Sequence, residues 1–364
     1  MLPGHVTIQL AKTPETPLSL LTVRRCWLPP PAPFSFHRKV LHNIRVYRPL
    51  QYLALAVVAL AGVAGGVLYP MWRNAIDRND RNAVADPHHI AGNLYFVGVP
   101  DVTSFLLLGD KGDVLIGGGH EGNGRKIINN IEQLGFSVKN VRMLLATDAD
   151  SGAAGGLAEL QQATGAELWA SDASADVIAS GGSNNPNTVY VPWKLLGWSG
   201  VTQYPAPRVN HRFKEGETIR LGQLALTAHV LSHGTGCTTW TFTVNDRNRD
   251  LHVVHRCSLE VPYRASLVEP QRYPGIRADF ERTFVTLRSL PADIWLTTQG
   301  REYGRFRKFD ASRRIENALR DGTEQSGVEP DPVAPFIDPQ GYLDSIDKAE
   351  ASFRKLLAEQ ERRP

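Results

Sequence analysis

The chain has 364 residues, 42% of them hydrophobic and 21% charged, which is typical of a globular protein with one large or two modest cores. The formal net charge of +3 is uneven, because residues 1–48 hold seven lysines and arginines against one glutamate, or +6, which leaves about −3 elsewhere. Basic charge confined to one tail excludes a general nucleic-acid-binding surface. The three cysteines, Cys26, Cys237 and Cys257, have no CxxC or Cys/His finger spacing, which excludes a structural zinc ribbon.

The first 72 residues predict a membrane anchor behind a basic tail. Residues 1–48 contain WLPPPAPF and little periodicity, so we expect a disordered cytoplasmic tail. Residues 49–72 carry no charge, and as a helix these 24 residues can span a hydrocarbon core of about 30 Å. Tyr52, Tyr69 and Trp72 lie near its ends, where interfacial aromatic residues occur.

The charge distribution predicts the orientation of this anchor. Because the basic excess precedes the apolar segment, the positive-inside rule places the N-terminus in the cytoplasm and the main domain in the periplasm or outside the cell. We therefore expect a single-pass inner-membrane protein, in which residues 49–72 serve as a transmembrane anchor or uncleaved signal. A cleaved signal peptide, with Ala64 and Gly66 near the cleavage site, is the alternative, and it exports the same domain.

Residues 73–87 are predicted to form a polar linker, after which strands and helices follow in a regular pattern. Apolar runs bounded by turn residues predict strands at NLYFVGV, SFLLLG, DVLIG, VRMLLA and ELWAS. Helices are predicted at EGNGRKIINNIEQLG, GGLAELQQATG and ASADVIASGG. The first of these helices has apolar residues at helical spacing and ends at Gly135.

The second half of the chain has a similar pattern. HRFKEGETIRLGQLALTAHVL predicts a strand, a turn and a strand, and CTTWTFTV and LHVVHRC predict a hairpin across NDRNRD. IRADFERTFVTLRSL and SIDKAEASFRKLLAEQERR predict amphipathic helices on either side of the strand ADIWLTT. This order favours two sheets packed together with helices outside, in the α/β (α+β) class.

The order of these elements, with LLATDADSGAAGG at a strand tip, resembles the metallo-β-lactamase superfamily, and most closely its subclass-three enzymes. The matching segments cover residues 88–362 and are NLYFVG with DVLIGGG, NNIEQLGFSVKNVRMLL, GGLAELQQATGAELWAS, LTAHVLSHGTGCTTWTF and PFIDPQGYLDSIDKAEASFRKLLAEQ. The resemblance implies a four-layer αββα sandwich over residues 88–364. It also implies a metal-dependent hydrolase of the metallo-β-lactamase type, if the chain is an enzyme.

The family's zinc ligands are largely replaced in this chain. Their motif is His-x-His-x-Asp-His, in which two histidines bind the first zinc and the Asp-His pair binds the second. The matching residues here are Asp148, Asp150, Gly152 and Ala153. His233 retains the third ligand of the first zinc, whereas Gln299 stands at the late histidine of the second.

The chemistry of these residues predicts the loss of the second metal. Glycine and alanine have no side-chain ligand atom, and Gln299 is a weak neutral ligand. Asp148, Asp150 and His233 could bind one divalent metal, and their oxygen atoms shift the preference from zinc toward manganese, iron or magnesium. A carboxylate oxygen reaches roughly 1 Å less far than an imidazole nitrogen, while metal–ligand distances tolerate only about ±0.2 Å. We therefore expect no metal or one divalent metal (zinc, manganese or iron), and no two-zinc centre.

Three functional hypotheses follow. In the first, the protein is catalytically impaired and binds a small molecule or a partner, with Asp148 and Asp150 as a solvated pair that stabilises the turn before a helix. In the second, Asp148, Asp150 and His233 hold one metal that hydrolyses amide or ester bonds, including those of β-lactams. In the third, GGGHEG (117–122) is a dinucleotide-binding GxGxxG motif, although the hairpin order of the preceding strands argues against it.

Further residues are expected near the same pocket. Cys257 and Ser258, in RCSL, match the family's ADSL stretch. Cys237 and Cys257 lie nearly opposite each other in the predicted hairpin, so either a disulfide or two buried thiols are expected. The loop that contains Trp193, Trp198 and Tyr204 borders the pocket if the resemblance holds.

Overall fold

The computed structural model describes residues 85–185, 203–231, 236–261, 265–269, 275–322 and 330–362, together with Tyr52, Val57 and Gly62. The predicted tail (1–48) lies outside the described residues, as does the predicted anchor (49–72) apart from those three helical residues. Within the described ranges, no helix is long and apolar enough to cross a membrane. The chain divides into two compact units, Met1–Pro70 and Met71–Pro364, and every described strand belongs to the second.

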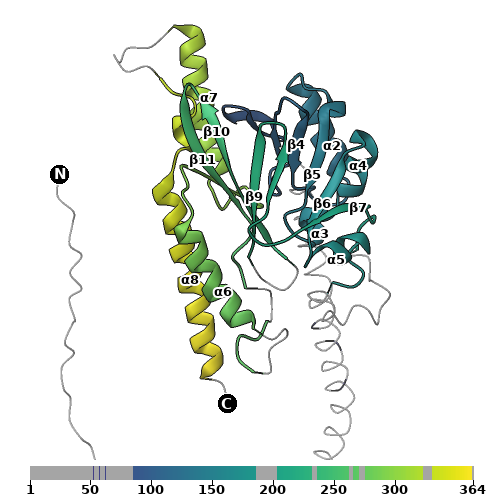
Figure 1. Cartoon of the computed structure of the whole chain (residues 1–364). Helices are drawn as coiled ribbons and strands as arrows, with labels where there is room; N and C mark the ends of the chain where they lie inside the picture. Colours follow the sequence, from purple (N-terminus) through teal and green to yellow (C-terminus); the bar gives the residue numbers. More distant parts are fainter. Residues whose placement is uncertain are drawn as a thin grey trace, which may run out of the picture. The chain divides into compact units, whose positions relative to one another are not determined.

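Two β-sheets form the centre of this second unit (Figure 1). The larger sheet contains, as neighbours in chain order, β1 (His88–Ala91), β2 (Leu94–Phe96), β3 (Phe105–Leu107), β4 (Asp113–Ile116), β5 (Val141–Leu145), β6 (Glu167–Ser171) and β7 (Val209–Phe213). The smaller sheet has the order β12-β11-β10-β9-β8, with β8 (Thr218–Leu221), β9 (Leu224–Val230), β10 (Thr238–Asp246), β11 (Arg249–Arg256) and β12 (Ile294–Thr297). Because β4, β5 and β6 run parallel, the loops after them meet at one edge of the larger sheet.

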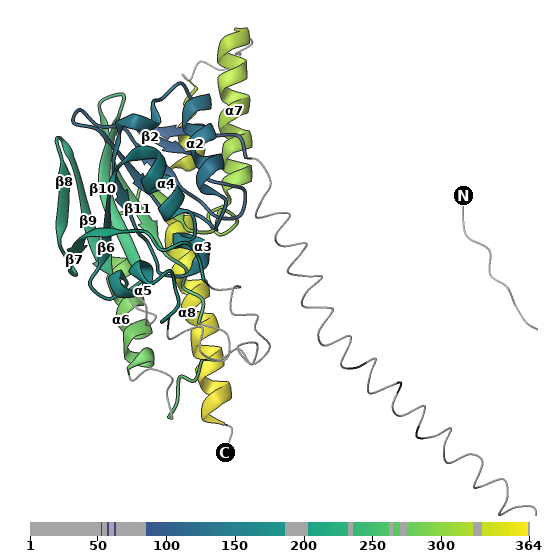
Figure 2. The same ribbon diagram turned by 90° about the vertical axis from the view of Figure 1, so that its right-hand side faces the viewer.

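Helices cover the outer sides of both sheets. On the larger sheet lie α2 (Gly124–Gln133), α3 (Ser151–Ala154), α4 (Leu157–Thr164) and α5 (Ala175–Ala179), and on the smaller sheet lie α6 (Ile276–Ser289) and α8 (Pro339–Glu361). Figure 2 shows a further helix, α7 (Arg305–Asp321), which extends beyond the sheets. The four-layer αββα arrangement predicted from the sequence is therefore confirmed.

Two apolar clusters hold these layers together. One lies between the sheets and beneath α6 and α8, and includes Phe105, Trp240 and Phe353, each at most 1% exposed. The other joins α2 and α4 to the outer side of the larger sheet, through residues such as Ile127 and Leu160. Burial of one such side chain contributes roughly 1.5–3 kcal/mol, so the sheets have an extensive core of their own.

Three elements differ from the prediction. Residues 209–230 form three strands rather than two, because β8 and β9 are joined by a further tight turn at Gly222, whose φ of +58° suits glycine. Strand β1 precedes the first predicted strand. Helix α7 was not predicted, because the side chains that it buries are Arg305, Lys308 and Ser312 rather than an apolar stripe.

Candidate functional site at the tip of strand β5

The two aspartates at the tip of β5 have different environments. Asp148 is 8% exposed, and its Oδ1 atom accepts a hydrogen bond of 3.1 Å from the backbone N–H of Asp150, which closes the turn. Asp150 is exposed and is the N-cap residue of α3, but its carboxylate does not cap the helix. Its Oδ1 atom instead accepts a hydrogen bond of 2.9 Å from Asn185 Nδ2. Asp148 therefore has the turn-stabilising role expected for the pair but is not solvated, whereas Asp150 is exposed and does not cap the helix as expected.

Tyr204 closes the same loop from a distant part of the chain. Its hydroxyl donates a hydrogen bond of 2.7 Å to the backbone carbonyl of Ala149, and its side chain is 6% exposed. Burial raises the pKa of Tyr204 well above its usual value, and the negative charges of Asp150 and Asp148 raise it further. The phenol therefore remains a neutral donor that holds the aspartate loop. Trp193 and Trp198, predicted in the same loop, lie outside the described residues.

His120 covers the place of the missing second-metal aspartate. A Cβ atom built on Gly152 would lie 3.2 Å from Cε1 of the His120 ring and within 3.8 Å of both ring nitrogens. The loop that carries His120 is fixed there, because Gly118 N–H donates to the Ala153 carbonyl at 2.9 Å and Gly156 N–H donates to the Gly119 carbonyl at 3.2 Å. A side chain at Gly152 would therefore contact an imidazole.

These contacts also overturn the dinucleotide-binding hypothesis. Two glycines of GGGHEG contact the chain's own α3, because Gly118 donates to the Ala153 carbonyl and Gly119 forms a β-bridge with Ala154. Strands β1 to β4 form an antiparallel meander, unlike the parallel βαβ unit that a dinucleotide fold requires. The motif is a close-packed turn between β4 and α2.

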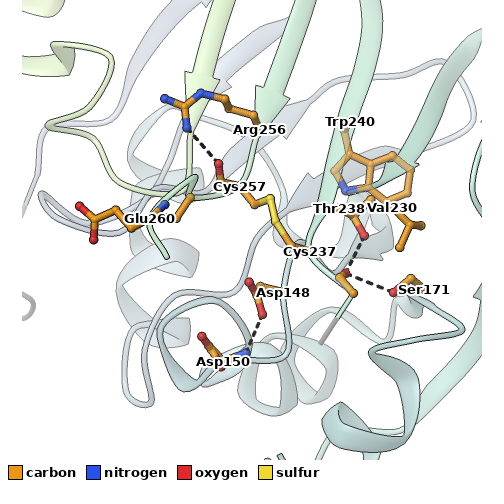
Figure 3. Close-up of a disulfide and its surroundings, with 12 residues drawn as sticks. Asp148, Asp150, Ser171, Val230, Cys237, Thr238, Trp240, Arg256, Cys257 and Glu260 are labelled. Atoms are coloured by element: carbon orange, nitrogen blue, oxygen red, sulfur yellow. Dashed lines mark hydrogen bonds between the residues drawn. A yellow bond between two sulfur atoms is a disulfide. The ribbon is translucent and has the colours of Figure 1, made fainter. Parts of the chain in front are cut away.

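A disulfide joins Cys237, which directly precedes β10, to Cys257, which directly follows β11, in the smaller sheet. It lies close to Asp148 at the β5 tip (Figure 3). Both cysteines are at most 2% exposed and their Cα atoms are 6.0 Å apart. Next to it, Thr238 N–H donates to the Thr147 carbonyl at 2.7 Å, which joins the start of β10 to the tip of β5. Of the two states expected for these cysteines, the disulfide is the one that forms. Its sulfur atoms carry no thiolate that could bind a metal.

A buried ion pair supports this disulfide and was not predicted. Arg256 donates through Nη1 to the Cys257 carbonyl at 3.0 Å and forms an ion pair of 3.0 Å with Glu302. Burial raises the pKa of Glu302, and the positive charge of Arg256 opposes this shift. Ser258, expected beside the pocket, accepts a hydrogen bond of 3.2 Å from the Glu260 N–H. Arg256 stands in the RCSL stretch, but no local pattern pairs it with Glu302, which only the fold brings beside it.

The metal-ligand positions are only partly assembled among the described residues. Gln299 is exposed, forms a β-bridge with Val102, and uses its carbonyl to accept hydrogen bonds from the Thr297 hydroxyl and the Glu302 N–H. His233 lies outside the described residues. Within those residues, no three His, Cys, Asp or Glu side chains come close enough together to hold a metal ion.

The donor chemistry does not fit a second metal. Gly152 and Ala153 offer no side-chain ligand atom, and an imidazole lies against the first of them. For a first metal, Asp148 and Asp150 offer carboxylates at the expected strand tip, although each already accepts a hydrogen bond from the protein. The chain therefore has two carboxylates, Asp148 and Asp150, at the first-metal site. At the second-metal site only Gln299 offers a side-chain ligand atom.

Several solved structures that resemble this chain are metallo-β-lactamases. BJP-1, a subclass B3 enzyme of Bradyrhizobium japonicum, is 28% identical with a TM-score of 0.64, over 78% of this chain and 97% of that one. A point mutant of FEZ-1 from Legionella gormanii is 30% identical with a TM-score of 0.65, over 77% and 97%. LRA-12, a class B3 di-zinc enzyme from an Alaskan soil metagenome, is 26% identical with a TM-score of 0.64, over 76% and 96%.

No family model matches the chain. The similarity to solved structures nevertheless extends over almost the whole length of each neighbour and over more than 75% of this chain. On this basis the chain belongs to the metallo-β-lactamase superfamily, close to subclass B3.

Proposed function

We propose that this protein is an impaired metallo-β-lactamase relative, which acts by binding a small molecule or a partner at the β5 tip rather than by two-metal hydrolysis. The observation that carries the proposal is the environment of Gly152, where the second-metal aspartate of the family is absent and the His120 imidazole lies 3.2 Å from the Cβ position. The disulfide, Tyr204 and the Arg256–Glu302 pair hold the surrounding loops. Such support suits a rigid binding surface as well as a catalytic one.

A single-metal hydrolase is the second candidate, favoured by the two neighbouring carboxylates. Asp148, Asp150 and His233 would hold the ion, which would supply Lewis-acid polarisation of an amide or ester carbonyl. Oxygen-rich ligation favours manganese or iron over zinc. To act as ligands, the aspartates would have to rearrange the bonds that they accept from the Asp150 N–H and from Asn185. That rearrangement is the physical argument for ranking this candidate second.

The two candidates differ in their dependence on metal. The full chain, purified in detergent, would be assayed against a chromogenic β-lactam and simple esters with zinc, manganese and iron in turn. The impaired-relative proposal predicts no turnover above the free metal, and an unfolding temperature that does not respond to chelator. Turnover that chelator and Asp150→Ala both abolish would contradict it and establish the hydrolase.

A restored-motif variant tests whether the scaffold still permits zinc binding. It combines Asp148→His, Asp150→His, Gly152→Asp and Ala153→His, which rebuilds the family motif around His233. Zinc uptake by this variant, and not by the parent chain, would show that ligand loss alone explains the missing metal. Failure to bind zinc would show that the surrounding loops have also changed.

We also propose that residues 49–72 hold the protein in the inner membrane, with the metallo-β-lactamase-like unit in the periplasm or outside the cell. The uncharged 24-residue segment and the basic tail before it support this orientation. The Cys237–Cys257 disulfide is consistent with an oxidising compartment. Protease treatment of spheroplasts should degrade the unit while membranes retain the N-terminal fragment, and release of the intact unit in soluble form would contradict anchoring.

A further inference from the structure

Helix α7 presents an arginine-rich face to solvent. The side chains that it buries, Arg305, Lys308 and Ser312, lie on one side of the helix. Four exposed arginines occupy the opposite side, together with two aspartates, and these arginines are Arg307, Arg313, Arg314 and Arg320. The outward face therefore carries an excess of positive charge along the helix, whose 17 residues span about 26 Å.

Most of these arginines have no acidic partner among the described residues. Arg307, Arg314 and Arg320 form no ion pair with any residue in the described ranges, and Arg313 reaches Asp310 and Asp86 only at 3.7 and 4.0 Å. Exposed arginines on other elements are paired more closely, as Arg288 is with Asp347 at 2.7 Å. Charge left unpaired along one helix suits an anionic partner.

One apolar side chain accompanies this charge. Phe306 is 47% exposed and borders the arginines, whereas Leu319, 44% exposed, lies seven residues after Ser312 and so on the side that the helix buries. A basic helix face with an exposed phenylalanine is typical of segments that lie at a membrane interface. Arginine and phenylalanine together bind headgroups and enter the boundary of the acyl chains.

The described part of the second unit also begins beside α7. Asp86 lies 4.0 Å from Arg313, and the ring of His88 stacks on the ring of Phe309 with centroids 4.1 Å apart. Only residues 73–84 separate this point from the apolar segment that ends at residue 72. Twelve residues reach at most about 40 Å, so a membrane that held the segment would lie within reach of α7.

We propose that α7 lies on the anionic lipid surface of the bilayer, with its arginines on lipid phosphates and Phe306 in the interface. In Figures 1 and 2, α7 extends past the ends of the strands on the side away from α3. Docking through α7 therefore turns the β5 tip away from the membrane, toward ligands in the surrounding compartment. The orientation rests on the proposed anchoring, whereas the lipid contact of α7 does not depend on any metal.

The test uses the full chain with bilayers that contain a trace of phospholipid with a photoreactive headgroup. After illumination, mass spectrometry of peptides maps the lipid adducts. We expect adducts on 305–321 in bilayers of phosphatidylglycerol and phosphatidylcholine, and their loss in phosphatidylcholine alone or in 1 M salt. This expectation holds whether or not residues 49–72 insert.

A charge-reversal variant, Arg307→Glu with Arg314→Glu and Arg320→Glu, should lose the adducts, because each basic side chain near an anionic surface strengthens association roughly fivefold. The matched control reverses Arg142, Arg208 and Arg220, which are also exposed and form no ion pair among the described residues. It should keep the adducts on α7. Adducts that are absent from α7, or equally abundant in the reversal variant, would overturn the proposal. Neither result depends on whether the β5 tip binds metal.

Discussion

His255 is a buried histidine whose replacement should make the protein less sensitive to acid. It lies on β11, is 1% exposed, and neither ring nitrogen has a hydrogen-bond partner among the described residues. Phe105 from the opposite sheet contacts its ring edge-on, with centroids 5.3 Å apart. Burial, aided by the charge of Arg256, lowers the pKa of His255 from 6.5 to about 3. We consider the change His255→Leu, which keeps a similar volume and removes both nitrogens.

The size of the effect follows from linkage between protonation and folding. Because the folded pKa lies below the unfolded one, protons bind first to the unfolded chain, and stability is lost as pH falls below 6.5. At pH 5 the loss is about 2 kcal/mol, from 1.5 pH units at about 1.4 kcal/mol each, whereas at pH 7.5 it is close to zero. Removal of two unsatisfied polar atoms should also stabilise the leucine variant by roughly 1–3 kcal/mol at every pH.

Urea unfolding at pH 7.5, 6.5 and 5, monitored by tryptophan fluorescence, measures both the loss of stability in acid and the gain that does not depend on pH. The free energy of unfolding of His255→Leu should fall by about 2 kcal/mol less than that of the parent chain between pH 7.5 and 5. Leu296→Met, at the position paired with His255 on β12, is the control and should leave the pH dependence unchanged. His88→Phe should reduce the loss of stability between pH 7.5 and 5 by a similar amount, because burial lowers the pKa of His88 to about 3 as well. Equal pH dependence in the parent and His255→Leu would refute the reasoning.

Three further results are expected. Replacement of Cys237 and Cys257 by serine should lower the free energy of unfolding by about 3 kcal/mol, since the disulfide closes a loop across 20 residues, and an unchanged urea midpoint would contradict this. In a restored-motif variant that also carries Gln299→His, the further change His120→Ala should raise zinc uptake from about one to about two ions per chain, as measured by elemental analysis. Two ions with His120 in place would show that the imidazole does not obstruct the second position. Tyr204→Phe should lower the free energy of unfolding by about 1 kcal/mol by removing its bond to the loop carbonyl, and no change in urea unfolding would count against that role.

The sequence predicted the fold well because most buried faces follow regular periods. The stripe of α2, with Ile127 and Ile131, and the alternation of β10 both point to the core in the structure. Helix α7 escaped prediction because its buried side is held by Arg305 over the ring of Phe96 and by the ion pair between Lys308 and Asp338. Such partners come from distant parts of the chain and leave no local pattern.

The candidate site was predicted in position but not in its supporting contacts. Asp148 and Asp150 lie at a strand tip as expected, because a strand that ends in a polar loop before small residues is a local signal. The contact between His120 and Gly152 joins two loops that are far apart in sequence, and so do the bonds of Tyr204 and Asn185. These contacts depend on how parallel strands bring their loops together, which only the fold determines.

Metal content is the most direct test of the central claim that the β5 tip no longer works as a metal centre. The full chain would be purified without chelator, incubated with zinc, manganese and iron in turn, freed of excess metal and measured by elemental analysis beside Asp150→Ala. The account predicts well under one metal ion per chain, with no difference between the parent and Asp150→Ala. One or two tightly bound ions per chain, lost in Asp150→Ala, would contradict it and identify the β5 tip as a working metal centre.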